Sequence, residues 1–306
     1  MDDAAVAARV WRELNAGPLD VAGLPERVAC EPDELARFHV PLARMLIGRC
    51  LGEAGRYLVA IAGVPAGGKS VFTALMVRVL RALEPPFGVA AVGLDGYHYP
   101  NAYLDAAVAP SGGGPLRLWK GAHFTFDVRR LAADLRRLRA GEGPLALPAY
   151  DRRRHEPAEG AILVGPSDRL VLVEGNYLLF REGEWAEVFP LFGLRIFLAL
   201  PPGVNRERLV ARHVRGGRSR GEALAHFDRS DWPNTVLVAG TAAQADVTVS
   251  LDAGYRVVGV RPSLLPPGDT GGPRATPHNH PGRGGGGVWG GGGRVGGGGA
   301  RLTPTE

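Results

Sequence analysis

One short stretch of the chain has the composition and spacing of a phosphate-binding loop. Residues 63–70 read GVPAGGKS and fit the pattern G-x-x-x-x-G-K-[ST], between an expected strand and an expected helix. Glycine lets backbone N–H groups turn toward phosphate oxygens, and a helix start adds the positive end of its dipole. Of the 36 lysines and arginines, only Lys69 and Lys120 are lysines, and a compact ammonium reaches outer phosphates that a planar guanidinium does not fit in the same way. We expect the phosphate contacts from Gly63, Ala66, Gly67, Gly68, Lys69, Ser70 and Val71.

Two acidic residues stand at the ends of apolar runs, where strands would end. Asp95 follows the run VGL, and Glu174 ends the run LVLVE. Ligands bind at the carboxyl edge of a parallel sheet, so Asp95 is placed to accept the proton of an attacking hydroxyl and to touch a metal. Glu174 and the Ser70 hydroxyl are oxygen ligands of the kind that Mg²⁺ prefers. The simpler alternatives are that Asp95 caps a turn and that Glu174 caps the segment after it.

A basic stretch from Arg206 to Arg220, RERLVARHVRGGRSR, is interrupted by a pair of glycines. We interpret it as a helix and a mobile lid whose arginines close over a triphosphate and neutralise charge in the transition state. Arg212 and Arg215 are expected to contact the nucleotide, and Arg218 is expected to act in catalysis. The competing interpretation is a solvated arginine-rich helix.

The segments that position these groups read as a parallel sheet covered by helices. Between residues 57 and about 260, short apolar runs alternate with amphipathic stretches. We therefore expect an α/β fold, namely a three-layer α/β/α P-loop NTPase arrangement with a mostly parallel five-stranded sheet and an arginine-rich lid. The expected strands are Tyr57–Ala62, Val89–Leu94, Leu170–Glu174, Arg195–Leu200 and Val247–Leu251. Two shorter strands around the charged turn DRRRHEPAEG are expected to form an excursion from this sheet.

Composition divides the chain into three segments. Residues 1–56 read as helices, and Pro41 is expected to break or kink the second of them; whether this segment covers the sheet or makes a homo-oligomer is left open. Residues 57–260 form the phosphate-loop domain, in which Ala109–Pro115 reads as a short flexible insertion. Residues 261–306 are rich in Gly and Pro and cannot bury enough apolar surface, so we expect a disordered tail.

Composition and charge disfavour several classes of protein. The chain has 306 residues, of which 45% are hydrophobic and 22% charged, and it has no apolar run of membrane-spanning length. The acidic N-terminal stretch MDDAAVAARV is unlike a signal peptide, and Cys30 and Cys50 lack metal-ligand spacing, which favours a reduced, cytoplasmic protein. The net charge is +5, but part of it lies in the tail, so it does not indicate a nucleic-acid partner.

Together these motifs resemble those of the P-loop kinases of the phosphoribulokinase, uridine kinase and bacterial pantothenate kinase group. The chain is most similar to the nucleoside/nucleotide kinase members of that group, some of which are called fructose-transport-associated kinases. The resemblance covers roughly residues 35–252 and rests on GVPAGGKS, LDGYHY, KGAHFTFD, PAYDRRRHEP, VEGNYLL, the basic stretch and DWPN. The sequence HEP stands at residues 155–157, where the group has H-D-P, so the charge is kept.

The resemblance implies a kinase that uses ATP and Mg²⁺ and phosphorylates a hydroxyl of a nucleoside, sugar or pantothenate-like acceptor. Asp95 would be the base, with Lys69 and Arg218 as the other catalytic groups. The acceptor would meet Tyr97, His98, Asp127, Tyr150, Arg152 and Asn234. Lys120 either contacts the acceptor or holds its loop. The rival hypotheses are a regulatory nucleotide-binding protein without a small-molecule acceptor and a nucleic-acid-associated ATPase, which the near-neutral charge outside the tail disfavours.

Overall fold

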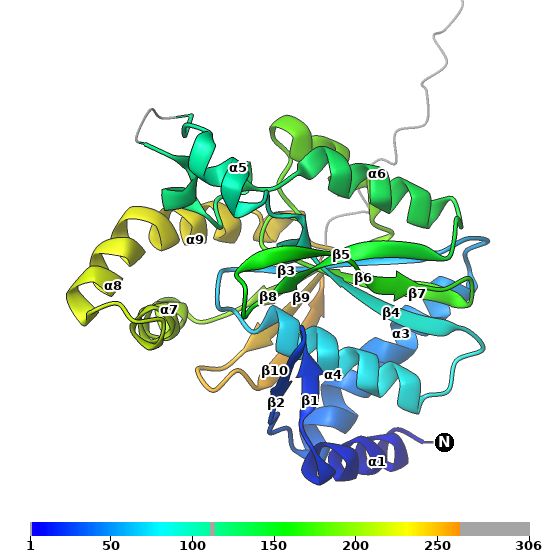
Figure 1. Ribbon diagram of the computed structural model, residues 1–306. Helices are drawn as coiled ribbons and strands as arrows, with labels where there is room; N and C mark the ends of the chain where they lie inside the picture. The colour runs from blue at the N-terminus through cyan, green and yellow to red at the C-terminus, as the bar shows by residue number, and fades with distance from the viewer. Residues whose placement is uncertain (1, 111–113, 264–306) are drawn as a thin grey trace, which may run out of the picture. The chain divides into compact units, whose positions relative to one another are not determined.

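The computed structural model describes residues 2–110 and 114–263, and these residues build a six-stranded sheet with the strand order β10-β9-β8-β3-β7-β4 (Figure 1). All neighbours in it pair in parallel, except that β10 pairs antiparallel with β9. The strands are β3 (Tyr57–Gly63), β4 (Gly88–Gly93), β7 (Asp168–Glu174), β8 (Leu194–Ala199), β9 (Val247–Leu251) and β10 (Val257–Pro262). The α/β fold with a mostly parallel sheet is confirmed, and the five expected strands lie within two residues of their predicted bounds.

The sixth strand, β10, is the part of the sheet that the sequence did not predict. It reads VVGVRP and lies at an edge of the sheet, where only its first residue, Val257, is buried. A partly exposed edge strand lacks the continuous apolar run that marks a strand covered on both faces. The β9–β10 hairpin therefore had no clear signal in the sequence.

Two layers cover the sheet and confirm the three-layer arrangement. Successive side chains of a strand point to opposite faces, so Val59 and Ile61 of β3 enter one core while Leu58 and Ala60 enter the other. The first layer consists mainly of α1 (Asp3–Ala16), α3 (Val40–Leu51) and α4 (Lys69–Ala82). The second layer consists mainly of α6 (Val128–Arg139) and the antiparallel strands β5 (Leu145–Asp151) and β6 (Glu156–Val164), which are the expected excursion from the sheet.

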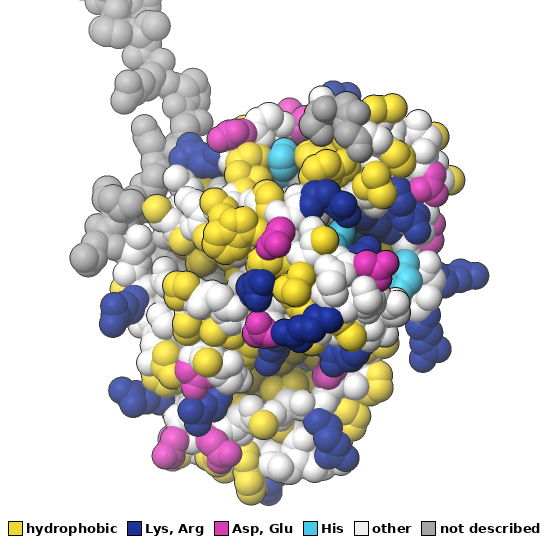
Figure 2. All heavy atoms as spheres, turned by 90° about the vertical axis from the view of Figure 1, so that its left-hand side faces the viewer, with side chains coloured by type: hydrophobic (Ala, Val, Ile, Leu, Met, Phe, Trp, Pro, Cys, Tyr) yellow, Lys and Arg dark blue, Asp and Glu magenta, His cyan; other side chains and the backbone are white. Residues whose placement is uncertain are grey.

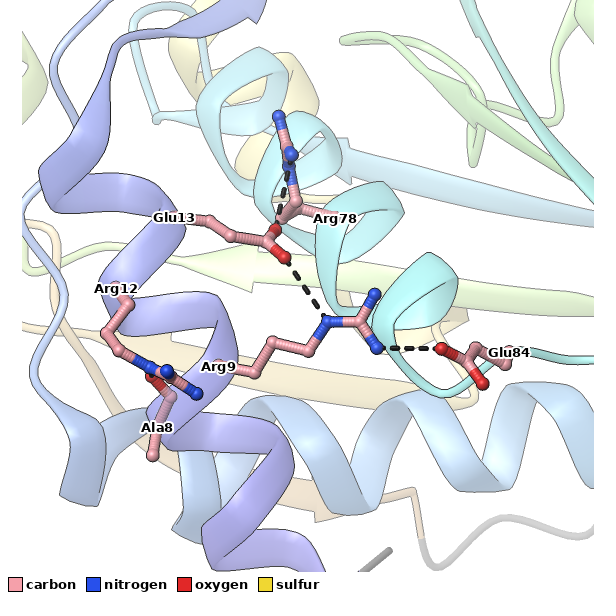
Figure 3. A network of polar contacts seen from close by, with 6 residues as sticks. All are labelled: Ala8, Arg9, Arg12, Glu13, Arg78 and Glu84. Atoms are coloured by element: carbon pink, nitrogen blue, oxygen red, sulfur yellow. Dashed lines mark hydrogen bonds and ion pairs between the residues drawn. The ribbon is translucent and has the colours of Figure 1, made fainter.

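The N-terminal segment packs on the sheet. Four α1 residues are buried in the first core at helical spacing: Val6, Ala7, Val10 and Leu14. Ion pairs also link α1 to α4 and its end, since Glu13 pairs with Arg78 at 3.2 Å and Arg9 pairs with Glu84 at 2.8 Å (Figure 3). Such exposed pairs contribute about 0–1 kcal/mol each. The buried apolar stripe is therefore what mainly holds α1 against the sheet.

The second N-terminal helix continues through Pro41 instead of breaking there. α2 (Pro32–Glu34), a π-helical turn (Leu35–His39) and α3 follow one another without interruption. Pro41 directly follows the π-helical turn, so the regular α-helical hydrogen-bond pattern is already interrupted where proline has no N–H group to donate. A short unpredicted hairpin of β1 (Leu19–Val21) and β2 (Leu24–Glu26) joins α1 to this helical stretch.

The remaining helices gather on the left-hand side of the molecule in Figure 1. They are α5 (Asn101–Ala106), α7 (Val204–Arg215), α8 (Arg220–His226) and α9 (Trp232–Ala239). Among the described residues, no helix has both the length and the apolar character needed to cross a membrane. The predicted disordered tail lies outside the described residues from residue 264 onward, as do residues 111–113 of the predicted insertion.

Candidate active site

The phosphate loop joins β3 to α4 at the predicted position. Ala66 and Gly68 both adopt left-handed backbone conformations, with φ +55° and +83°. A side chain at Gly67 would place its Cβ only 2.7 Å from the Val64 carbonyl oxygen, which is too close. The shape of the backbone therefore requires this glycine. The loop leads directly into the first turn of α4. The first N–H groups of a helix have no carbonyl partner within it, so such a helix start is suited to bind an anion.

Lys69 is the first residue of α4, and its side chain is buried. Its ammonium donates a hydrogen bond to the Val64 carbonyl at 3.0 Å. Burial lowers the pKa of Lys69, and the nearby carboxylates of Glu174 and Asp95 oppose that shift. An ammonium held beside backbone amides and acidic groups is suited to the outer phosphates of a nucleotide.

Ser70 and Glu174 provide two oxygen ligands side by side. The Ser70 hydroxyl donates to Glu174 Oε1 at 2.7 Å, which connects α4 to the end of β7. Burial raises the pKa of Glu174, the Asp95 charge adds to the rise, and Lys69 opposes it. A hydroxyl next to a buried carboxylate fits the oxygen preference of Mg²⁺, and a cation bound there would stabilise the ionised form of Glu174.

Asp95 lies in the tight turn that follows β4. Its carbonyl accepts a hydrogen bond from the His98 N–H at 3.2 Å, so the main chain closes the turn. Its carboxylate is 41% exposed and pairs with Arg152 at 3.7 Å. The Asp95 charge acts on the pKa values of both Lys69 and Glu174. An accessible carboxylate thus stands in one electrostatic environment with the phosphate loop and with the candidate metal ligand Glu174.

Side chains from two other segments lie beside Asp95, as expected for an acceptor side. The Tyr150 ring of β5 is 5.4 Å from the His98 ring and 5.2 Å from the Lys120 ammonium. Burial, followed by the charge of Asp95, raises the pKa of Tyr150 to about 12. The structure therefore brings Tyr150, Arg152, His98 and Lys120 together around the candidate base.

Comparisons with known proteins agree with this geometry, although no protein-family model matches the chain. The uncharacterized protein YggC of Escherichia coli (strain K12) is 34% identical over 235 residues, which cover 76% of this chain and 94% of that protein. The Schizosaccharomyces pombe protein named "Putative uridine kinase C227.14" is 30% identical over 200 residues, covering 63% of this chain and 83% of that protein. The crystal structure of a "putative fructose transport system kinase" from Silicibacter sp. TM1040 is 30% identical with a TM-score of 0.59, covering 66% of this chain and 94% of that one. This chain belongs to the P-loop kinases.

The kinase is therefore a phosphotransferase with an alcohol group as acceptor. Membership of this family implies the use of ATP with Mg²⁺. The loop, the Ser70–Glu174 pair and the exposed Asp95 carboxylate are the parts that such a reaction needs.

One expected acceptor contact of the kinase lies in the core, and a second caps a helix. Tyr97 is 1% exposed, and its hydroxyl donates to Asp134 of α6 at 3.2 Å, inside the second core. The prediction that Tyr97 faces the acceptor is therefore wrong, because the turn after β4 directs this side chain into the core. Asp127 is the N-cap residue of α6 and accepts the Arg130 N–H at 3.0 Å. One oxygen of the Asp127 carboxylate therefore caps α6, and its contact with the acceptor stays a prediction.

Lys120 holds its own loop in the structure. Its ammonium donates to Asn101 Oδ1 and to the His155 carbonyl, both at 2.7 Å. Burial lowers the pKa of Lys120, and the charge of Arg117 adds to this effect. Of the two alternatives from the sequence, these contacts favour the loop-holding role, with the ammonium still close to Tyr150.

The basic stretch of the kinase forms α7 and α8 with a break between them, as predicted. The break spans residues 216–219 and begins with the two glycines, of which Gly217 has φ +96°. α8 then begins with a capping box in which Ser219 and Glu222 satisfy each other's backbone N–H groups. Figure 2 shows the face of the molecule on which these helices lie, and Lys and Arg side chains gather near its centre.

The three lid arginines differ in their contacts and in their influence on the phosphate loop. Arg212, Arg215 and Arg218 are all exposed. The Arg212 charge lowers the pKa of Lys69, so Arg212 lies within electrostatic reach of the phosphate loop. Arg218 donates to His213 Nδ1 at 3.2 Å, and His213 Nε2 bonds Asp231 at 2.7 Å. Arg212 therefore has the more direct link to the nucleotide site, and Arg218 is tied to the lid itself.

Two further residues complete the comparison with the sequence. Asn234, on α9, is half-buried, and within the described residues it makes no hydrogen bond to the groups around Asp95. Tyr255 was not predicted at all, yet its hydroxyl donates to the Ala66 carbonyl of the phosphate loop at 2.8 Å. The two residues are 189 positions apart, so no local pattern could have linked them.

Proposed function

We propose that this kinase transfers the γ-phosphoryl group of ATP to a hydroxyl of a nucleoside, a sugar or a pantothenate-like molecule, with Asp95 as the general base. The observation that carries the proposal is the position of the Asp95 carboxylate. It is partly accessible to solvent, it pairs with Arg152 at 3.7 Å, and its charge shifts the pKa values of Lys69 and Glu174. A base in such a reaction must lie between the end of the nucleotide and the acceptor hydroxyl. The Arg152 contact and the influence on Lys69 and Glu174 support this position for Asp95.

The nucleotide side of the site supports this assignment. The N–H groups at the start of α4 and the Lys69 ammonium would bind the phosphates, because both present positive charge to them. Ser70 and Glu174 would hold Mg²⁺, which neutralises phosphate charge when it is bound. Arg212 adds positive charge from the lid. Catalysis would come from positioning and charge neutralisation, without a covalent intermediate.

The side chains on the acceptor side suit a polar small molecule as the phosphoryl acceptor. Tyr150 offers an aromatic face and a phenol, and Arg152 offers a guanidinium, both next to the proposed base. An aromatic face and charged donors suit a ring that carries hydroxyl groups. The relative named as a uridine kinase supports a nucleoside acceptor, and the structural relative named for fructose transport supports a sugar.

A coupled ADP-release assay of the purified chain tests the proposal. Nucleosides, pentoses, hexoses, glycerate and pantothenate are offered one at a time with ATP and Mg²⁺, beside a control without acceptor. At least one acceptor is expected to raise ADP release clearly above that control, and the product should carry a phosphate ester by ³¹P NMR. Release that stays at the control rate for the whole panel, in a chain that binds the nucleotide, contradicts the proposal and favours a regulatory nucleotide-binding protein.

A further inference from the structure

The tip of the β9–β10 hairpin touches the phosphate loop through one aromatic residue. The Tyr255 hydroxyl donates to the Ala66 carbonyl at 2.8 Å. Its ring lies so close to Gly68 that a Cβ added there would stand 2.8 Å from Tyr255 Cδ1. Arg208 of α7 stacks on the same ring, with its Cζ 3.2 Å from the ring centroid. Tyr255 therefore joins the phosphate loop, the hairpin and the arginine helix, which are far apart in the sequence.

The hydrogen bond from Tyr255 is made to the carbonyl of Ala66, a residue that the loop holds in an unfavourable backbone conformation. Ala66 has φ +55°, and a left-handed conformation costs a residue with a Cβ about 1–2 kcal/mol. The peptide between Ala66 and Gly67 is planar, and the Gly67 N–H on its other edge donates to the Val64 carbonyl at 2.9 Å. Tyr255 and Val64 thus fix both edges of this plane. Its orientation determines where the N–H groups that follow, at the start of α4, can point.

The hairpin tip is itself constrained in a way that presents the tyrosine. Tyr255 has φ +68°, which is rare for a bulky side chain. The Asp252 carboxylate holds the turn by accepting the Gly254 N–H at 2.8 Å and the Arg256 N–H at 3.0 Å. Strain of this kind costs about 1–3 kcal/mol and persists only where the surrounding contacts over-determine it. Here the side chain of the strained residue contacts Ala66 and Gly68 of the phosphate loop, so the strained turn holds Tyr255 against that loop.

We propose that Tyr255 is a positioning residue for the nucleotide, because it fixes the Ala66–Gly67 peptide and so preorganises the first N–H groups of α4 for phosphate oxygens. This inference rests on the proposed function, since it requires the loop to bind a nucleotide. Without the hydroxyl, part of the loop is ordered only on binding, and that ordering lowers the affinity. Arg208 supports the ring from the lid helix and thereby couples that helix to the same loop.

Calorimetric titration of Mg²⁺–AMP-PNP into the full chain tests this role at the nucleotide step, with no acceptor present. Tyr255→Phe removes the hydroxyl and keeps the ring, and its Kd is expected to rise about 3–10-fold, the effect of one lost hydrogen bond. Tyr57→Phe is the matched control, because Tyr57 begins β3 at the end opposite to the loop; its Kd should equal that of the wild type. A Tyr255→Phe Kd equal to the wild-type value overturns the proposal, even if the melting temperature of the variant is lower than that of the wild type.

A second variant keeps the test decisive if Tyr255→Phe does not fold. Arg208→Gln leaves the hydroxyl in place and removes the stack that holds the ring against the loop, and its Kd is expected to rise above the wild-type value by about 2–3-fold. An Arg208→Gln Kd that stays at the wild-type value then overturns the proposal. A wild-type chain that does not bind Mg²⁺–AMP-PNP contradicts the proposed function as a whole. If the wild type binds Mg²⁺–AMP-PNP and the variants bind it with the same Kd, only the role of Tyr255 is contradicted.

Discussion

The two halves of the site are built in different ways. The phosphate half, residues 63–70 with Glu174, is made largely of main chain from one contiguous stretch, and its two charged side chains are buried. The acceptor half gathers Asp95 from one segment and Tyr150 and Arg152 from another, and the Asp95 and Arg152 side chains are 41% and 32% exposed. Changes in the first half should therefore affect nucleotide binding with every acceptor. Changes in the second half should affect the use of the acceptor alone.

The largest effect in this comparison is expected at Lys69. Lys69→Ala removes the buried ammonium between the loop and Glu174, so turnover should fall about 100-fold or more, and Mg²⁺–nucleotide affinity should fall with it. Lys120→Ala is the matched control, because it removes the other lysine of the chain, which bonds Asn101 and His155 instead. Calorimetry should give this control an unchanged nucleotide Kd. An unchanged Kd in Lys69→Ala would contradict the loop assignment.

A smaller and more selective effect is expected at Arg152. Arg152→Gln should raise the KM for the acceptor about 10-fold, the effect of a lost charged hydrogen bond, and leave the KM for ATP unchanged. Arg153→Gln, in the same exposed turn, controls for the general loss of positive charge. Initial rates with one substrate varied at a time separate the two constants. A rise in the KM for ATP alone would place Arg152 on the nucleotide side and break the division between the halves.

The pH dependence of metal binding sharpens the description of the phosphate half. Burial raises the pKa of Glu174 above its ordinary value of 4.5, so this carboxylate becomes protonated at a higher pH than an exposed glutamate. A protonated carboxyl is a poor Mg²⁺ ligand, and the affinity for Mg²⁺–AMP-PNP should therefore weaken as the pH falls from neutral into the mildly acidic range. Glu174→Gln should bind more weakly and show a flatter pH profile, while any titration of the nucleotide itself stays the same. Parallel profiles for the two proteins would exclude Glu174 as the titrating group.

The smallest effect is expected at Tyr97, which the structure places outside both halves. Tyr97→Phe removes the buried hydrogen bond to Asp134, so the free energy of unfolding should fall by about 1 kcal/mol. Both KM values should stay unchanged, because the ring remains in the second core. Chemical denaturation and steady-state kinetics measure these quantities on the same preparation. A raised acceptor KM with unchanged stability would return Tyr97 to the acceptor side.

The phosphate half could be predicted from the sequence because its geometry is local. The glycine positions and Lys69 specify a backbone shape within a few residues of one another, and the buried strands on either side read as continuous apolar runs. Ser70 and Glu174 were also paired correctly, since parallel strand ends meet at one edge of the sheet. What is fixed by main-chain geometry and strand order can be recognised without the structure.

The acceptor half was predicted less well because side-chain directions depend on tertiary packing. Tyr97 and His98 are adjacent, yet the first enters the core and the second lies beside Tyr150. Asp127 precedes an amphipathic helix and caps it, a local role that its position before the helix already indicates. Tyr255 sits on an edge hairpin with no apolar run to mark it, and its partner is far along the chain.

The effect of Asp95→Asn on nucleotide affinity and on turnover, measured side by side, tests the central claim most directly. Asn keeps the size of the side chain and cannot accept the proton of the acceptor hydroxyl. The account predicts an unchanged Kd for Mg²⁺–AMP-PNP and a kcat lower by about 100-fold or more with the acceptor that the screen identifies. A kcat equal to that of the wild type would contradict the account.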